Sequence, residues 1–167
     1  MLPLLADWLR ALKLNCGWPA KSEVTSAVIR DLDGWATTIN EHIGKGRWSL
    51  VVIWASNCHV CASEMPRYGA YYCSAPDPKF SILGVALDGY ARKKTIAETM
   101  AHWNMGFPSL VADMPAPQWT SAKLRTSSHY GTPIFALFGP SGQLRKLDVG
   151  PVWISELENF IREYSLR

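Results

Sequence analysis

The stretch Ser49-Leu-Val-Val-Ile-Trp-Ala-Ser-Asn-Cys-His-Val-Cys-Ala-Ser-Glu-Met-Pro66 decides the fold, because an apolar segment runs directly into a helical one. Leu50 to Trp54 is short, apolar and β-branched, which is typical of a strand covered on both faces. Asn57 is a suitable N-cap for the following helix. Cys58 and Cys61 then fall one helical turn apart, and the partial positive charge of the helix N-terminus favours a thiolate on Cys58.

The composition is that of one globular domain. A chain of 167 residues, of which 48% are hydrophobic and 19% charged, can bury a substantial core, whereas two domains would be cramped. The net charge of +3 arises from scattered basic residues, which argues against a nucleic-acid-binding protein. We therefore expect a single domain over residues 1–167, a monomer, and no nucleic-acid partner.

Apolar periodicity and turn residues divide the chain into alternating strands and helices. We interpret residues 1–23 as an N-terminal helical extension, which either packs on the domain or is the remnant of a membrane-proximal segment. Residues 24–167 are the predicted core, an α/β domain with a mixed sheet. Strands are predicted at 24–32, 50–54, 80–87, 107–111, 134–138 and 143–149, and helices at 35–43, 58–73, 92–104, 119–130 and 153–164.

The N-terminal residues lack the pattern of an export signal. Met1 to Arg10 has neither the basic start nor the uninterrupted apolar core of a signal peptide. No apolar run reaches the roughly 18 residues of a membrane-spanning helix. Either the protein is cytosolic or an export segment has been removed, and the sequence leaves both open.

The two cysteines outside the C-x-x-C motif allow two interpretations. Cys16 and Cys73 could form a structural disulfide in an oxidising compartment, or both could be unpaired buried thiols that pack as small hydrophobic side chains. A zinc site at Cys58 and Cys61 would need a second pair of ligands, which the isolated histidines do not supply. We therefore expect neither a metal nor an organic cofactor.

The opening stretch resembles the active-site segment of the thioredoxin-like superfamily. Trp54 and Ala55 precede the C-x-x-C motif as they do in that family, and Pro66 stands where the family's active-site helix is kinked. Gly131-Thr132-Pro133 resembles the family's cis-proline loop, and a strand, a Gly-containing turn and another strand follow it. The resemblance covers about residues 31–164 and implies a thioredoxin fold, with a central mixed sheet flanked by helices.

Further details are similar to the extracytoplasmic TlpA/ResA-like branch of this superfamily. They are the run Cys61-Ala-Ser-Glu-Met-Pro66, the hairpin from Phe135 to Gly150, and an insertion before the cis-proline loop. The resemblance implies a thiol:disulfide oxidoreductase in which Cys58 and Cys61 are catalytic. It also implies cysteine-containing protein substrates and a periplasmic or otherwise extracytoplasmic location, with a membrane anchor in the full-length protein. A membrane-bound redox partner would then reset the dithiol.

The proton-handling residue departs from the thioredoxin pattern. The buried acid of thioredoxin falls at Val52, which cannot transfer protons. The TlpA/ResA-like branch uses an acid after the second cysteine instead, and Glu64 matches it. Glu64 is three residues from Cys61 and therefore on the same helical face, where a partly buried carboxylate could accept the proton of Cys61. The alternative is a solvated helix glutamate.

Three neighbouring residues are expected to tune the dithiol. His59 and Val60 separate the two cysteines, and a protonated imidazole there would stabilise the Cys58 thiolate and make the disulfide more oxidising. Trp54, which precedes the motif, is the third.

The cis-proline loop is the predicted substrate-binding segment. A cis Thr132–Pro133 bond, preceded by Gly131, would expose the backbone of Thr132 to an extended substrate segment and place the substrate sulfur over Cys58. This would be strand addition used for substrate binding.

The sequence therefore favours a thiol:disulfide oxidoreductase that exchanges disulfides with protein substrates through Cys58 and Cys61. The resemblance favours an extracytoplasmic reductant, of the kind used in cytochrome c maturation. One alternative is an oxidase or isomerase of secreted-protein disulfides. Another is a thioredoxin-fold binding or chaperone module whose cysteines have no redox role.

Overall fold

A computed structural model describes residues 29–113 and 131–166 of the chain. These residues form one seven-stranded sheet in the order β2-β1-β5-β4-β3-β6-β7. The strands are β1 (Ile29–Arg30), β2 (Ala36–Thr37), β3 (Ser49–Trp54), β4 (Ser81–Ala86), β5 (Ser109–Ala112), β6 (Ile134–Phe138) and β7 (Leu144–Val149). The helices are α2 (His59–Ser74), α3 (Lys93–His102) and α5 (Ile154–Ser165), with short 3-10 turns η1 (Ile39–Glu41) and η2 (Tyr90–Arg92).

Strand β3 lies inside the sheet and is buried along its whole length. It pairs parallel with β4 and antiparallel with β6. Strand β4 pairs parallel with β5, whereas β6 and β7 form an antiparallel hairpin. The mixed α/β sheet predicted from the sequence is therefore confirmed.

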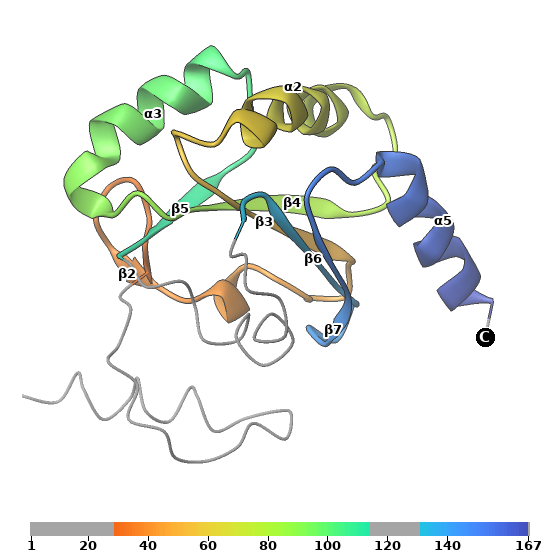
Figure 1. The fold of residues 1–167 in the computed structure, drawn as a ribbon. Helices are drawn as coiled ribbons and strands as arrows, with labels where there is room; N and C mark the ends of the chain where they lie inside the picture. The colour runs from red at the N-terminus through yellow and green to blue at the C-terminus, as the bar shows by residue number, and fades with distance from the viewer. Residues whose placement is uncertain (1–28, 114–130, 167) are drawn as a thin grey trace, which may run out of the picture.

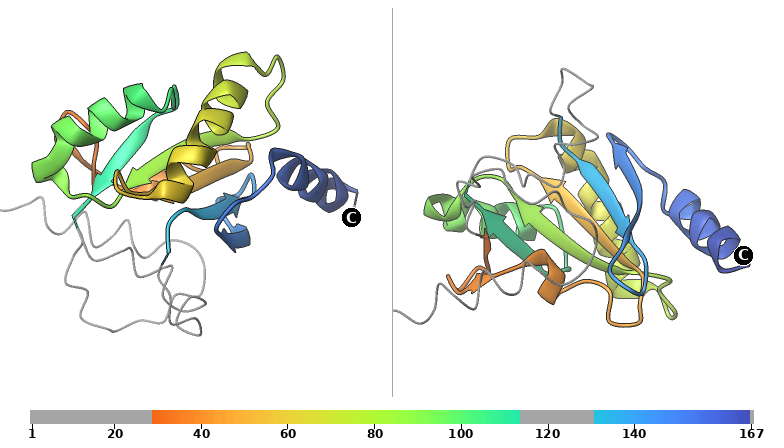
Figure 2. Two further views of the ribbon diagram at one scale, coloured as in Figure 1. Left: turned by 45° about the horizontal axis from the view of Figure 1, so that its top comes forward. Right: turned by 90° about the horizontal axis from the view of Figure 1, so that it is seen from below.

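The side chains of β3 alternate between two apolar clusters, one on each face of the sheet. Leu50, Val52 and Trp54 join the cluster that contains buried residues of α2, α3 and α5. Val51 and Ile53 join the cluster that contains apolar residues of η1 and the segment after it. Helices α2 and α3 lie together over one face, while the η1 segment crosses the other and α5 lies on the β6–β7 side (Figure 1, Figure 2).

The prediction of a helix over residues 35–43 is wrong. Residues of β2 instead pair antiparallel with β1, and only the single 3-10 turn η1 follows. The Asp31 carboxylate accepts hydrogen bonds from the backbone N–H groups of Gly34 and Trp35, both at 2.8 Å, and Gly34 has φ of +103°. This side-chain-capped turn, together with β-branched Thr37, favours a hairpin over a helix start.

The other predicted elements within the described residues are present, with ends that differ by a few residues. Pro66 lies inside α2, as expected. The N-terminal extension 1–23, most of the predicted strand 24–32 and the predicted helix 119–130 lie outside the described residues. Among the residues that the structure describes, no helix is long and apolar enough to cross a membrane.

Helix α2 packs closely against the loop that connects α3 to β5. A Cβ atom added at the buried Gly69 would lie 2.0 Å from the backbone oxygen of Asn104 and 2.7 Å from that of Met105. Asn104 itself has φ of +50°, a left-handed conformation that limits how far this loop can move. Glycine at position 69 therefore allows α2 to approach the backbone of this loop closely.

We predict that Gly69→Ala destabilises the fold, although alanine is the better helix former by about 1 kcal/mol. The methyl group has no room against the loop backbone, and overpacking of this kind costs about 1–3 kcal/mol or more. Chemical denaturation of both proteins would measure the difference. The control is Ala70→Gly at the adjacent exposed position, which should cost only the helix-propensity term. A Gly69→Ala variant more stable than the wild type would contradict this packing.

Candidate active site

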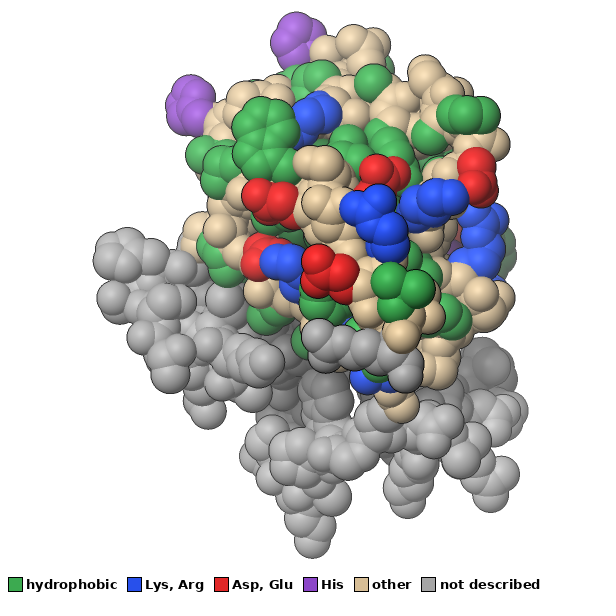
Figure 3. Space-filling view, turned by 90° about the vertical axis from the view of Figure 1, so that its right-hand side faces the viewer, with side chains coloured by type: hydrophobic (Ala, Val, Ile, Leu, Met, Phe, Trp, Pro, Cys, Tyr) green, Lys and Arg blue, Asp and Glu red, His purple; other side chains and the backbone are tan. Residues whose placement is uncertain are grey.

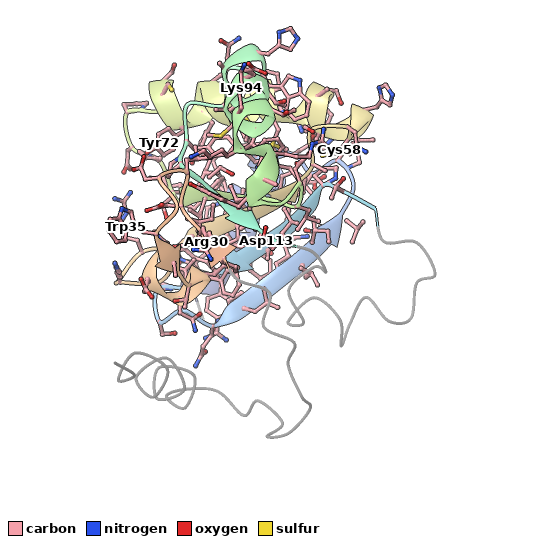
Figure 4. All side chains as sticks on the ribbon, turned by 90° about the vertical axis from the view of Figure 1, so that its left-hand side faces the viewer. Arg30, Trp35, Cys58, Tyr72, Lys94 and Asp113 are labelled. Atoms are coloured by element: carbon pink, nitrogen blue, oxygen red, sulfur yellow. A yellow bond between two sulfur atoms is a disulfide. The ribbon has the colours of Figure 1, made fainter. Side chains whose placement is uncertain are left out.

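The two cysteines lie where β3 ends and α2 begins, at the carboxyl end of the central strand. The chain leaves β3 at Trp54 and turns through three residues, with the Cys58 N–H donating to the Ala55 backbone oxygen at 3.1 Å. Figure 4 shows Cys58 near one side of the molecule and Tyr72, on the last turns of α2, toward the other. The two cysteines thus lie at the edge of the sheet where the carboxyl end of the buried strand β3 is found.

The N-cap of α2 is Cys58, so the expected capping by Asn57 is wrong. Cys58 has an extended backbone, with φ of −93° and ψ of 110°, and its Sγ accepts a hydrogen bond from the Cys61 N–H at 3.0 Å. Asn57 is exposed one position earlier. The nucleophile candidate therefore receives a backbone N–H directly, in addition to the field of the helix N-terminus, and both stabilise negative charge on the sulfur.

Cys58 and Cys61 form a disulfide, with Cα atoms 5.2 Å apart. The two sulfurs differ in accessibility, because Cys58 is partly exposed whereas Cys61 is completely buried. A substrate sulfur can therefore approach Cys58 alone, and Cys61 can react only with a sulfur already attached to its neighbour.

The loop 131–133 lies against this disulfide, although it is more than 70 residues away in the sequence. The Thr132–Pro133 peptide bond is cis, and the Thr132 backbone oxygen lies 3.2 Å from Cys58 Sγ. In the disulfide state these two atoms are in contact without a hydrogen bond. In the reduced state, the Cys58 thiol could donate a hydrogen bond to the Thr132 oxygen. Gly131 is exposed and Thr132 partly exposed, whereas Pro133 is buried.

Glu64 is buried, with 7% of its surface exposed, so its interpretation as a solvated glutamate is wrong. Its carboxylate accepts a hydrogen bond and ion pair from the Arg67 guanidinium one turn further along α2. Arg67 also donates to the Val152 backbone oxygen at 2.9 Å. Arg67 was not among the site residues predicted from the sequence, although its i,i+3 spacing from the acid was an available signal.

The three residues expected to tune the dithiol lie in different environments. Trp54 is completely buried, and its indole N–H donates to Ser109 Oγ at 3.0 Å while its ring packs edge-on against Trp103. His59 and Val60 are exposed on the first turn of α2. Trp54 thus packs in the core beneath the end of β3, whereas the side chains of His59 and Val60 face solvent.

A second buried carboxylate near the dithiol was also overlooked. The Asp88 side chain is only 2% exposed and accepts hydrogen bonds from Ser56, from the N–H at 3.0 Å and from the hydroxyl. The Arg92 guanidinium lies 3.7 Å from it. Asp88 lies two residues after the end of β4, and its bonds to Ser56 join the carboxyl ends of the parallel strands β3 and β4. An acid directly after a predicted parallel strand was the available signal.

Across residues 29–113 and 131–166, no cluster of three or more His, Cys, Asp or Glu side chains is placed to hold a metal ion.

Comparisons with known proteins agree with this architecture. No family model matches the sequence. The chain is 24% identical over 121 residues to the sporulation thiol-disulfide oxidoreductase A of Bacillus subtilis strain 168. The aligned region covers 71% of this chain and 69% of that protein. The solution structure of a thiol:disulfide interchange protein from a Bacteroides species superposes with a TM-score of 0.61 and 22% identity, over 81% of this chain and 86% of that one. The exposed lipoprotein thioredoxin Etrx1 of Streptococcus pneumoniae strain TIGR4 superposes with a TM-score of 0.55 and 19% identity, over 81% of this chain and 97% of that one.

The described residues have the thioredoxin fold, and the sequence is similar to that of a thiol-disulfide oxidoreductase. The thioredoxin fold expected from the sequence is thereby confirmed. Sequence likeness to a thiol-disulfide oxidoreductase and a disulfide-forming C-x-x-C pair together place this thioredoxin-like protein in the enzyme class that exchanges thiols and disulfides.

Cys73 stands apart from the redox pair of this thioredoxin-like protein. It is exposed near the end of α2 and forms no disulfide within the described residues. The interpretation of Cys73 as a buried thiol is therefore wrong. Cys16, its other proposed partner, lies outside the described residues.

We predict that the two active-site thiols differ strongly in alkylation rate after reduction. In a Cys16→Ser/Cys73→Ser background, iodoacetamide should modify Cys58 at least about tenfold faster than Cys61, since only Cys58 is accessible and stabilised as a thiolate. Mass spectrometry of the peptides would give both rates, and unfolded protein provides the control in which the rates should converge. Equal rates in the folded protein would contradict the burial of Cys61.

Proposed function

We propose that the protein exchanges disulfides with cysteine-containing protein substrates outside the cytoplasm and acts there as a reductant. The observation that carries the proposal is the asymmetry of the pair: a partly exposed Cys58 at a helix N-terminus and a completely buried Cys61 behind it. One sulfur is thereby suited to attack a substrate, and the other to resolve the product.

In the first step, the Cys58 thiolate attacks one sulfur of a substrate disulfide. The S–S bond of the substrate breaks, its second sulfur leaves as a thiolate, and Cys58 forms a mixed disulfide. The Cys61 N–H, which donates to Cys58 Sγ, lowers the proton affinity of this sulfur before the attack.

In the second step, Cys61 attacks Cys58 and releases the substrate as a dithiol. Cys61 must first lose its proton, and the buried carboxylate of Glu64, one turn further along α2, is the proposed acceptor. Two electrons pass to the substrate, and the Cys58–Cys61 disulfide forms. Oxidation of a substrate dithiol would follow the same steps in reverse.

The loop 131–133 is the proposed substrate-binding segment. The Thr132 carbonyl beside Cys58 Sγ and the exposed Gly131 are available to pair with an extended substrate backbone next to the disulfide. His59 and Val60 are exposed at the start of α2 and would contact the same substrate. Such pairing is largely independent of substrate side chains, which suits an enzyme with several protein substrates.

The proposed location is supported by the likeness to related proteins. The pneumococcal relative is an exposed lipoprotein, which supports an extracytoplasmic site for this chain as well. On the face that carries α5, acidic and basic side chains are interspersed (Figure 3), as suits contact with varied protein partners. A membrane-bound partner that returns electrons to Cys58 and Cys61 completes the proposed cycle.

We predict that the protein accelerates reduction of insulin by dithiothreitol, and that Cys58→Ser abolishes this activity. Cys61→Ser should instead accumulate a mixed disulfide with substrate, visible on a non-reducing gel, because the resolving thiol is missing. Cys73→Ser, which changes an exposed cysteine outside the redox pair, should keep wild-type activity. Equally negligible activity in wild type and Cys58→Ser, with client binding retained, would replace the enzyme by a binding module.

The direction of transfer is tested by equilibrating the pair against glutathione. We expect a reduction potential more negative than about −120 mV, the value of a strong disulfide oxidase. Mass spectrometry of alkylated protein at each glutathione ratio gives the fraction oxidised. A strongly oxidising value would reassign the protein as an oxidase of secreted proteins.

A further inference from the structure

The segment that leads from β7 into α5 exposes apolar side chains at alternate positions. Val149 is 47% exposed and Trp153 is 61% exposed, and Pro151 between them is exposed as well. Val152, in contrast, is buried. We refer to the exposed side chains of Val149, Pro151 and Trp153 as the 149–153 surface.

The 149–153 surface begins beside the loop that contacts the dithiol. The Gly150 N–H donates to the Pro133 backbone oxygen at 2.9 Å. The Thr132 oxygen, one residue earlier, lies 3.2 Å from Cys58 Sγ. Two printed contacts therefore connect the start of this surface to the sulfur that attacks the substrate in the proposed mechanism.

Trp153 is exposed but held in place. The Arg67 guanidinium lies over its ring, 4.4 Å from the ring centroid, and also donates to the Val152 oxygen at 2.9 Å. The Tyr68 hydroxyl donates to the same oxygen at 2.8 Å, and burial raises the pKa of this hydroxyl, so the donor keeps its proton. An aromatic side chain that is already ordered loses little conformational entropy when a partner covers it. Tryptophan at such positions is a frequent anchor of protein interfaces.

The distance from the dithiol suits the length of a short peptide segment. Arg67 follows Cys58 by nine residues on α2, which is about 13 Å along the helix at 1.5 Å per residue. An extended polypeptide covers this distance in about four residues at 3.3 Å each. A protein substrate whose sulfur lies at Cys58 therefore has neighbouring residues that can reach Trp153, which makes the substrate itself the expected occupant.

We propose that the 149–153 surface, with Trp153 as its anchor, binds an apolar side chain of the substrate a few residues from the reacting cysteine. This inference rests on the proposed function and deepens it, because it names the preferred substrates: extended segments with an aromatic or aliphatic residue near the cysteine. Backbone pairing at loop 131–133 does not distinguish substrate side chains. The preference arises at Trp153, where a substrate ring removes apolar surface from water and forms an aromatic pair.

The test uses short serine- and glycine-based peptides, each with one cysteine that carries thionitrobenzoate as a mixed disulfide. Attack by the Cys58 thiolate joins the peptide sulfur to Cys58 and releases thionitrobenzoate, whose absorbance gives the second-order rate constant. One phenylalanine is placed at each position from two to six residues before or after the cysteine. Each rate is divided by that of N-acetylcysteine with the same leaving group, which removes any general change in Cys58 reactivity.

In a Cys16→Ser/Cys73→Ser background, we expect phenylalanine at about four residues on one side of the cysteine to raise the rate about three- to tenfold over the serine peptide. Trp153→Ala should reduce this preference to about one, and Trp153→Phe should restore part of it. Trp153 forms no side-chain cap bond with α5, so its replacement removes no helix cap.

The matched control is Trp35→Ala, which should keep the wild-type preference. Trp35 is 75% exposed and lies between β1 and β2, at the edge of the sheet opposite β7. Figure 4 shows Trp35 and Cys58 at opposite sides of the molecule.

Three results would overturn the role of Trp153. They are equal preferences in wild type and Trp153→Ala at every position, no preference in the wild type, and a loss of preference in Trp35→Ala as well. A dimeric native mass that Trp153→Ala reduces to that of one chain would assign the 149–153 surface to contact between copies instead. A wild type that releases thionitrobenzoate no faster than Cys58→Ser would overturn the proposed function, and this inference with it.

Discussion

The whole arrangement depends on the burial of β3. Each of its six residues is covered, and its two faces belong to two different apolar clusters, so the strand has no freedom to shift in register. Its neighbours β4 and β6 pair with it residue by residue. The sheet thereby fixes the point at which the chain turns into α2, and the position of Cys58 follows from that point.

The loops around the dithiol are held from several directions by single side chains. Asp88 ties the turn before Cys58 to the end of β4, and Arg67 ties α2 to the loop after β7. Between them, Thr132 contacts Cys58 from the loop that precedes β6, the strand that pairs with β3 on the side opposite β4. The dithiol is thus surrounded by segments from distant parts of the sequence, each anchored to a different strand.

Much of this was predictable where the signal is local or strongly patterned. The apolar run of β3, the one-turn spacing of Cys58 and Cys61, and the Gly139 to Gly142 turn of the last hairpin each determine their own structure. The hairpin at Ala36–Thr37 was mistaken for a helix because the deciding contact is the Asp31 carboxylate, which caps a turn over only four residues. The partners of Glu64 could not be read from the sequence as a set, because Val152 reaches Arg67 only through the folded sheet.

The capping role of Cys58 gives the redox state of the protein a thermodynamic meaning for the fold. The sulfur that reacts is also the acceptor that satisfies an otherwise unpaired N–H at the start of α2. A thiolate accepts that hydrogen bond more strongly than a disulfide sulfur, because it carries a full charge. The cap of α2 therefore stabilises the reduced state, with a Cys58 thiolate, more than it stabilises the disulfide state. Since redox and folding equilibria form a closed cycle, a change that strengthens this cap more for the thiolate than for the disulfide must make the disulfide easier to reduce.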